Sequence, residues 1–197
     1  MQPDPASSPT QRRGTWRFTV YASVLALVAS AGCSSDTAAP DEPATTAADT
    51  ITVTSSAIPA GGAIPERFTC DGDSGSPPLR WNGVPVDAGA VALVVDDPDA
   101  PDGPFVHWVV LDIPTDITEV AADDVPGNAP QAANSFGNAL YDGPCPPSGT
   151  HHYRFTIYAL SAPTGLSGGA DLGTALQAID DKATARGRLI GTYRHAG

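Results

Sequence analysis

Short runs of hydrophobic residues, alternating or continuous, dominate the chain between residues 50 and 160. Residues 51–56 alternate as Ile-Thr-Val-Thr, and residues 90–95, 106–113 and 153–160 are rich in β-branched and aromatic side chains. Runs of this length and composition, bounded by glycine and proline, predict β-strands. Because the connections are long and irregular, the pattern favours a mostly β fold arranged as a sandwich, with long Pro/Gly-rich loops.

A different spacing of apolar residues appears only near the C-terminus. Asp171 is suited to cap the start of a helix, and Gly187 is suited to end it. The run Leu189 to Tyr193 can then form a last strand. Between the two signals, apolar side chains recur at helical intervals, at Leu172, Ala175, Leu176, Ile179 and Ala183.

The N-terminal third has the composition of an export signal. Arg12, Arg13 and Arg17 precede an apolar run of about 12 residues, shorter than the roughly 20 needed to span a bilayer. The following Ser-Ala-Gly-Cys at residues 30–33 resembles the lipobox of bacterial lipoproteins, which implies lipidation of Cys33. The alternative is an ordinary secreted protein with an incidental cysteine.

The next segment, residues 34–50, contains no aromatic and no large aliphatic side chain, so it predicts a disordered tether. We therefore expect a lipoprotein signal peptide over 1–32, a tether over 33–50 and one domain over 51–197. The protein would sit in the cell envelope, lipid-anchored on the outer face of the membrane, or be secreted if Cys33 is unmodified.

Charge and cysteine content limit the ligands that the protein can bind and indicate its redox environment. Without residues 1–32 the chain has seven basic and 21 acidic residues, a net charge of −14, which argues against binding nucleic acid. Outside the cytoplasm, Cys70 and Cys145 can form a disulfide, although two free thiols are also compatible with the sequence.

Three strands each bring a titratable residue to an apolar face at a loop rich in glycine and proline. Asp97 follows the face of Val91, Leu93 and Val95, because side chains alternate along a strand. The same alternation puts His151 on one face with Tyr153 and points His152 the opposite way, toward solvent with Arg154. By this rule His107 shares its face with Val109, Leu111 and Ile113.

A carboxylate near histidines raises their pKa, so this cluster predicts a cationic pocket for a small anion. Asp97, His107 and His151 could alternatively hold a metal ion or act as acid and base. No motif pairs a nucleophile with a base, since Ser148 lies in a Pro/Gly turn. We therefore expect a binding protein without catalytic residues, cofactor or metal.

Several motifs resemble the phosphatidylethanolamine-binding protein family, and more closely its bacterial Raf kinase inhibitor-like branch. This resemblance implies a Greek-key antiparallel β-sandwich with a pocket for anionic groups such as phospholipid head groups. The motifs are DPDAP at 97–101, HWVVLDIP at 107–114 and GPCPPSGTHHY at 143–153, with FTCDG at 68–72 and SPPLRW at 76–81.

Motif position assigns seven ligand-binding residues. Asp97 and Asp99 would form the pocket rim, and the lining would consist of His107, Gly143, Pro147, His151 and Tyr153. The leading hypothesis is thus a lipid-anchored protein that binds a small anionic ligand or phospholipid head group. The alternative is an inhibitor or regulator that acts on a protease or signalling partner through the loops around the pocket.

Overall fold

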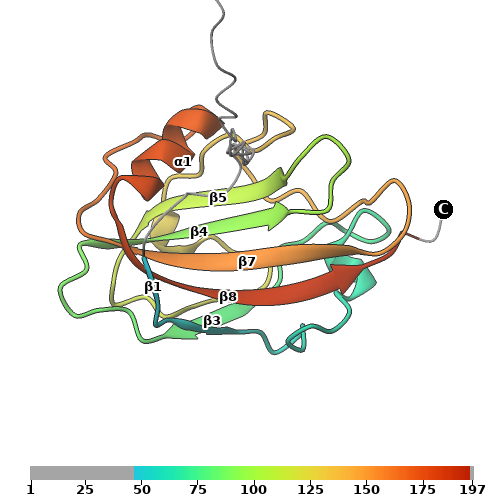
Figure 1. The fold of residues 1–197 in the computed structure, drawn as a ribbon, viewed down its shortest axis with the longest axis horizontal. Coiled ribbons are helices and arrows are strands. Elements are labelled where there is room, and N and C mark those ends of the chain that lie inside the picture. Colours follow the sequence, from blue (N-terminus) through green and yellow to red (C-terminus); the bar gives the residue numbers. More distant parts are fainter. Residues whose placement is uncertain (1–46, 196–197) are drawn as a thin grey trace, which may run out of the picture. The chain divides into compact units, whose positions relative to one another are not determined.

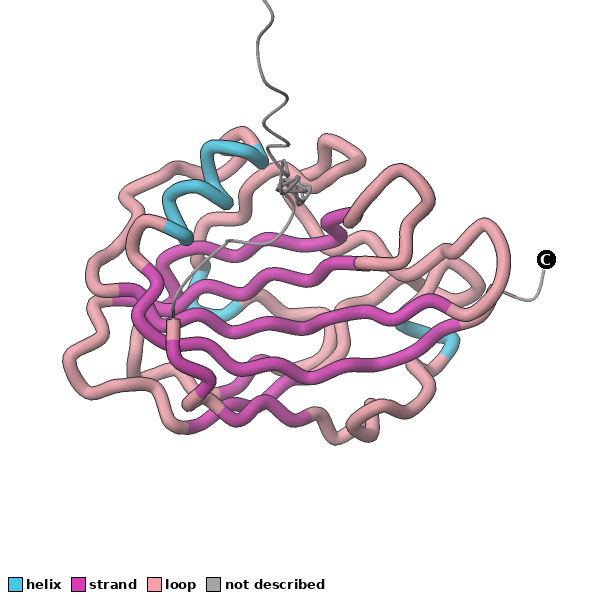
Figure 2. The backbone as a smooth tube through the Cα atoms, in the orientation of Figure 1, coloured by secondary structure: helices cyan, strands magenta, loops and turns pink. Residues whose placement is uncertain are grey.

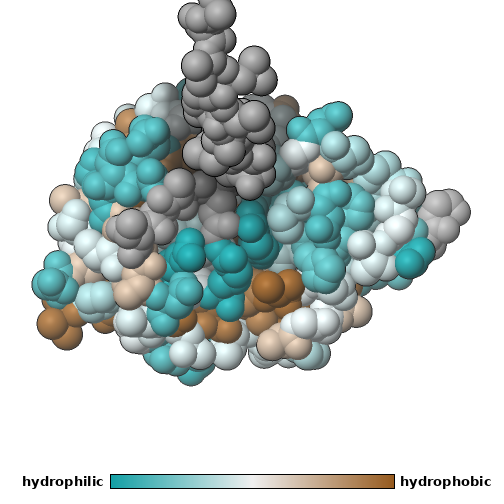
Figure 3. Space-filling model, viewed as in Figure 1, coloured by the Kyte–Doolittle hydropathy of each residue, from teal (hydrophilic) through white to brown (hydrophobic). Residues whose placement is uncertain are grey.

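The computed structural model describes residues 47–195 of the 197-residue chain (Figure 1). The expected signal peptide, the lipidation site Cys33 and most of the expected tether lie outside the described residues. No helix within 47–195 is long and apolar enough to cross a membrane. The face of the domain drawn in Figure 3 is largely hydrophilic, with smaller hydrophobic patches between.

Two sheets form most of the domain (Figure 2). The smaller sheet is antiparallel and contains β2 (Thr52–Thr54), β3 (Leu79–Asn82) and β6 (Glu119–Val120). Two short 3-10 helices, η1 (Glu66–Phe68) and η2 (Pro126–Asn128), lie in the connections. The larger sheet has the order β1 (Ala48–Asp49), β8 (Ala183–Tyr193), β7 (His151–Leu160), β4 (Ala90–Asp97) and β5 (Phe105–Ile113).

The strand β4 lies inside the larger sheet, and all eight of its residues are buried. One face of the strand, including Val91 and Leu93, packs in a core shared with Trp81 of the smaller sheet. The other face, including Val94, packs against Ile179 of the helix α1 (Leu172–Asp180). Burial on both faces explains why this strand is a continuous apolar run and not an alternating one.

The larger sheet is mixed, so the expectation of purely antiparallel pairing is wrong at one edge. Its β1 runs parallel to β8, whereas the other neighbours are antiparallel. Ala48 and Asp49 belong to the segment expected to be a disordered tether, and Arg186 Nε donates a 2.8 Å hydrogen bond to Asp49 Oδ1. Strand pairing uses backbone groups, so a segment without large side chains can still join a sheet edge.

The C-terminal helix ends earlier than the sequence predicts. Asp171 caps it as expected, since its Oδ1 accepts a 3.0 Å hydrogen bond from the Thr174 amide. The helix stops at Asp180, and β8 takes up Ala183 and Gly187, which the sequence assigns to the helix and its stop. A Cβ atom at Gly187 would lie only 1.7 Å from the Ile51 carbonyl oxygen. Glycine is required there by the close approach of another backbone segment, not by a helix end.

Candidate functional site

A cavity of about 330 Å³ lies where three neighbouring strands of the larger sheet begin or end. Asp97 is the last residue of β4, His151 is the first residue of β7, and Phe105 and His107 lie at the start of β5. Three loop segments complete the wall. The lining residues are Asp97, Ala100, Pro101, Asp102, Gly103, Phe105, His107, Phe136, Cys145, Pro146, Pro147, His151 and Tyr153.

A buried histidine–carboxylate pair forms one polar wall. The distance from His151 Nδ1 to Asp97 Oδ2 is 2.7 Å, and the two side chains are only 9% and 5% exposed. The second carboxylate oxygen, Asp97 Oδ1, accepts a 2.8 Å hydrogen bond from the backbone amide of Asp99. Both oxygens of Asp97 are therefore engaged within the protein, and Nε2 is the ring atom of His151 that remains for a ligand.

His107 reaches the same cavity through an irregularity in its strand. Pairing runs from Val95 with Trp108 to Asp96 with Val106, so His107 is the extra residue of a β-bulge. Its ring packs edge-to-face on Tyr153, with the centroids 5.4 Å apart. Regular alternation wrongly places His107 with Val109 and Leu111, which instead pack in the cluster with the helix α1.

The electrostatics of His107 also differ from the expectation. Burial lowers its pKa, and this outweighs the hydrogen bond to the Asp142 backbone and the negative charge of Asp97, which act the other way. Since the Asp142 carbonyl oxygen, 2.8 Å from His107 Nδ1, can only accept, Nδ1 carries the proton. In the neutral ring Nε2 is then a hydrogen-bond acceptor, and the prediction of a raised pKa is wrong for this residue.

The remaining wall is aromatic. Phe105 stacks edge-to-face on Phe136 at 4.7 Å and on His107 at 5.4 Å, and Phe136 is 54% exposed. Tyr153 is fully buried, and its hydroxyl makes no hydrogen bond of good geometry. The Asp97 carboxylate is nevertheless near enough to affect the pKa of this hydroxyl. Burial and this negative charge both raise the Tyr153 pKa, so the phenol stays protonated. The cavity thus combines two histidines with an apolar, aromatic surround.

The structure brings together five of the seven residues assigned from the motifs: Asp97, His107, Pro147, His151 and Tyr153. Asp99 is not part of the lining. Its carboxylate accepts hydrogen bonds from the backbone amide and Nδ1 of the exposed His152, and these bonds lower its pKa.

Gly143 is also not part of the lining, because it packs against another loop. A Cβ atom at this position would lie 2.8 Å from the Thr69 Cα, so the glycine allows two loops to meet. Among the lining residues that the motifs do not assign, Phe105 begins a visibly apolar strand. Phe136 comes from a distant loop that carries no such signal.

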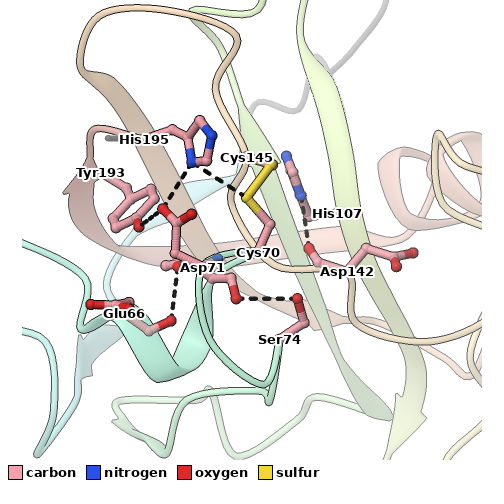
Figure 4. The surroundings of a disulfide bond; sticks show 10 residues. Glu66, Cys70, Asp71, Ser74, His107, Asp142, Cys145, Tyr193 and His195 are labelled. Atoms are coloured by element: carbon pink, nitrogen blue, oxygen red, sulfur yellow. Dashed lines mark hydrogen bonds and ion pairs between the residues drawn. A yellow bond between two sulfur atoms is a disulfide. The ribbon is translucent and has the colours of Figure 1, made fainter. Parts of the chain in front are cut away.

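Beside the cavity, Cys70 and Cys145 form a disulfide with a Cα–Cα distance of 5.4 Å (Figure 4). This bond joins the loop after η1 to the loop before β7, and Cys145 itself lines the cavity. Of the two alternatives that the sequence left open, the structure has the bridge. On its other side, Asp71 accepts hydrogen bonds from the Tyr193 hydroxyl and from His195 Nδ1.

The similarity to known proteins extends over the part of the chain that forms the cavity. The family described as phosphatidylethanolamine-binding protein matches residues 54–194. A UPF0098 protein of Methanothermobacter thermautotrophicus is 44% identical over 138 residues, which are 68% of this chain and 91% of that protein. A Mycobacterium tuberculosis protein named "Putative lipoprotein LppC" is 43% identical over 149 residues, covering 75% of this chain and 74% of that protein.

Solved structures show the same likeness. The crystal structure of Escherichia coli YbcL, described as a new member of the mammalian PEBP family, superposes with a TM-score of 0.70. It is 30% identical in sequence, and the match covers 74% of this chain and 99% of that one.

Proposed function

Since this chain belongs to the phosphatidylethanolamine-binding protein family, we propose that its cavity binds a small anionic group of the phosphate type. The observation that carries the proposal is the paired arrangement of His107 and His151 in one cavity. In each ring Nδ1 is engaged by the protein, at 2.8 Å and 2.7 Å respectively, which leaves two Nε2 atoms for a ligand.

The two rings suit a ligand that both donates and accepts hydrogen bonds. In the His151 ring Nδ1 contacts the Asp97 carboxylate, and a proton on Nε2 would be donated to an anionic oxygen of the ligand. Neutral His107 accepts at Nε2, which fits the P–OH of a phosphate monoester or the ammonium group of phosphoethanolamine. Sulfate has no donor to offer His107 and serves as the matched negative probe.

The cavity favours binding over catalysis in this proposal. Among residues 47–195, no hydroxyl or thiol hydrogen-bonds to the ring of His107 or His151, as an activated nucleophile would require. Cys145, the sulfur-bearing residue of the lining, is held in the disulfide. The aromatic surround of Phe105 and Phe136 supplies contact area and excludes water.

Phosphate and phosphoethanolamine at millimolar concentration are expected to raise the melting temperature of the wild-type protein at pH 6. A ligand at 100 times its Kd stabilises the native state by about 2.7 kcal/mol, and each kcal/mol shifts the Tm of a domain this size by about 2–4 °C. His151→Gln removes the imidazole ring that the contact with Asp97 holds in place, with Nε2 left for the ligand, and is expected to abolish most of the shift. Differential scanning calorimetry measures the effect.

His152→Gln is the matched control, because His152 is exposed and bonds to Asp99 outside the lining. The shift should persist in that variant, and sulfate should produce less of it than phosphate. An unchanged Tm in the wild type, or an equal phosphate shift in His151→Gln, would contradict the pocket. If phosphate does not bind but a protein partner does, the result would instead favour the alternative function, an inhibitor that acts through the loops around the pocket.

We further propose that the protein is anchored at the outer face of the membrane through lipidated Cys33. The support is the Ser-Ala-Gly-Cys motif at residues 30–33 after an export-type segment, together with the name "Putative lipoprotein LppC" of the mycobacterial relative. Mass spectrometry of the membrane fraction is expected to show an acylated N-terminal peptide beginning at Cys33, with no acyl mass in Cys33→Ser. A soluble wild-type form with an unmodified cysteine would contradict the anchor.

A further inference from the structure

Outside the cavity, the disulfide lies within a cluster of metal-type ligands (Figure 4). His195 Nδ1 is 3.9 Å from Cys70 Sγ, and one ligand atom from each of Cys70, Cys145 and His195 lies within 4.8 Å of the others. Asp71 Oδ2 accepts a 2.8 Å hydrogen bond from the same His195 nitrogen. These residues come from three segments far apart in the sequence, so the fold itself assembles the cluster.

The spacing is close to that of a tetrahedral zinc site. Zn–S bonds of about 2.3 Å and Zn–N bonds of about 2.0 Å place neighbouring ligand atoms roughly 3.5 Å apart. The distance of 3.9 Å from His195 Nδ1 to Cys70 Sγ is already close to this ligand–ligand distance. The two sulfurs are bonded to each other in the structure, so they cannot ligate a metal until the disulfide is reduced.

Reduction is sterically accessible, because Cys70 and Cys145 are both exposed and His195 is half-buried beside them. Exposed disulfides are the ones that thiol exchange can reach. Two thiolates and one imidazole form a ligand set that selects zinc over magnesium or calcium, and a water molecule can complete the tetrahedron.

We propose that this cluster is a redox-gated zinc site, closed in the disulfide form and formed by Cys70, Cys145 and His195 when a thiol reductant opens the bond. The reductant's two thiols become a disulfide as the protein's disulfide becomes two thiols. Zinc then replaces the two thiol protons, which leave to solvent. His195 Nδ1 gives up its hydrogen bond to Asp71 and binds the metal; the Nδ1 proton moves to Nε2 in the neutral ring, or leaves to solvent where Nε2 already carries one.

The test uses the purified full-length protein, zinc ions, and a phosphine reductant that leaves no competing thiol. We expect one tightly bound zinc per reduced protein by native mass spectrometry and none in the same protein left oxidised. Cobalt in place of zinc should show the absorption of thiolate coordination. His195→Gln, which keeps the disulfide, is expected to weaken zinc binding to the reduced protein about tenfold or more, by competition with a chromophoric chelator.

His152→Gln is the control, because this histidine also bonds to an aspartate but lies away from the cysteines, and it should bind zinc as the wild type does. Circular dichroism follows the fold of the reduced protein throughout. Zinc binding of equal strength in His195→Gln and wild type, whether the reduced chain is folded or unfolded, would overturn the proposal. So would the absence of bound zinc after reduction. Since His195 does not line the cavity, neither result depends on the anion-binding proposal.

Discussion

Replacing Cys70 and Cys145 together by serine is expected to lower the free energy of unfolding by about 4 kcal/mol. The bridge closes a loop with a sequence separation of 75 residues, and the entropy of closing a loop of this length in the unfolded chain corresponds to about 4 kcal/mol. Urea denaturation of the double variant and the oxidised wild type, followed by far-ultraviolet circular dichroism, measures the difference.

The wild type under reducing, zinc-free conditions is the natural control, because Cys33 is present in both proteins and only the bridge differs. It should match the double variant to within about 1 kcal/mol, the usual scale of a conservative surface change. A loss below about 1 kcal/mol in both would mean that the loops around Cys70 and Cys145 stay together in the unfolded chain or are held in place by other contacts.

Asp96→Ala is expected to destabilise the domain by about 3 kcal/mol, because it removes one partner of a buried ion pair. Asp96 is 2% exposed and the Arg154 side chain is 16% exposed. Arg154 Nε lies 3.0 Å and 3.1 Å from the two carboxylate oxygens of Asp96. Without the carboxylate, the guanidinium loses its main hydrogen-bond acceptor in a place where water cannot fully replace it.

An exposed pair gives the matched comparison. Glu119 forms an ion pair with Arg80 between neighbouring strands, but these side chains are 61% and 70% exposed. Glu119→Ala is therefore expected to cost no more than about 1 kcal/mol in the same denaturation experiment. Equal losses in Asp96→Ala and Glu119→Ala would show that burial of the Asp96–Arg154 pair does not set its contribution.

The strands that the sequence predicts well are those with long apolar runs. The strands β4, β5 and β7 were predicted close to their observed bounds, because burial inside the larger sheet requires continuous hydrophobic side chains. Among the short strands, the alternation at residues 51–56 predicts β2, whereas β3 and β6 show no pattern that marks them as strands. The start of β8 was mistaken for helix, since Arg186, Gly187 and Arg188 carry no apolar signal and the glycine serves a close backbone contact.

Side-chain alternation predicts which residues lie together only where the strands are regular. Side-chain alternation correctly brought together Asp97, His151 and Tyr153, because β4 and β7 pair with each other without interruption. His107 belongs to the same cavity, but the alternation argument assigned it to the wrong face, because a bulge cannot be read from composition. Phe136 could not be predicted, since only the folding of a separate loop brings it to the cavity.

The direction of the His107 pKa shift could not be predicted from the sequence either. The residues nearby suggested a carboxylate that raises it, whereas burial has the larger effect and lowers it. A linear pattern shows which charges can meet but not how much water the fold removes from each group. This difference changes the expected ligand: a neutral acceptor beside a potential donor favours a protonated phosphate group over an anion without a donor.

The measurement that tests the binding claim most directly is nuclear magnetic resonance of the histidine side-chain nitrogens during a phosphate titration at pH 6. We expect the Nε2 signal of His151 to shift as this nitrogen donates a hydrogen bond to phosphate. The Nε2 signal of His107 should shift in the direction expected for a nitrogen that accepts a hydrogen bond. The nitrogen signals of the exposed His152 should stay unchanged. If saturating phosphate leaves the nitrogens of both His107 and His151 unshifted, the cavity is not the anion site and the central claim is wrong.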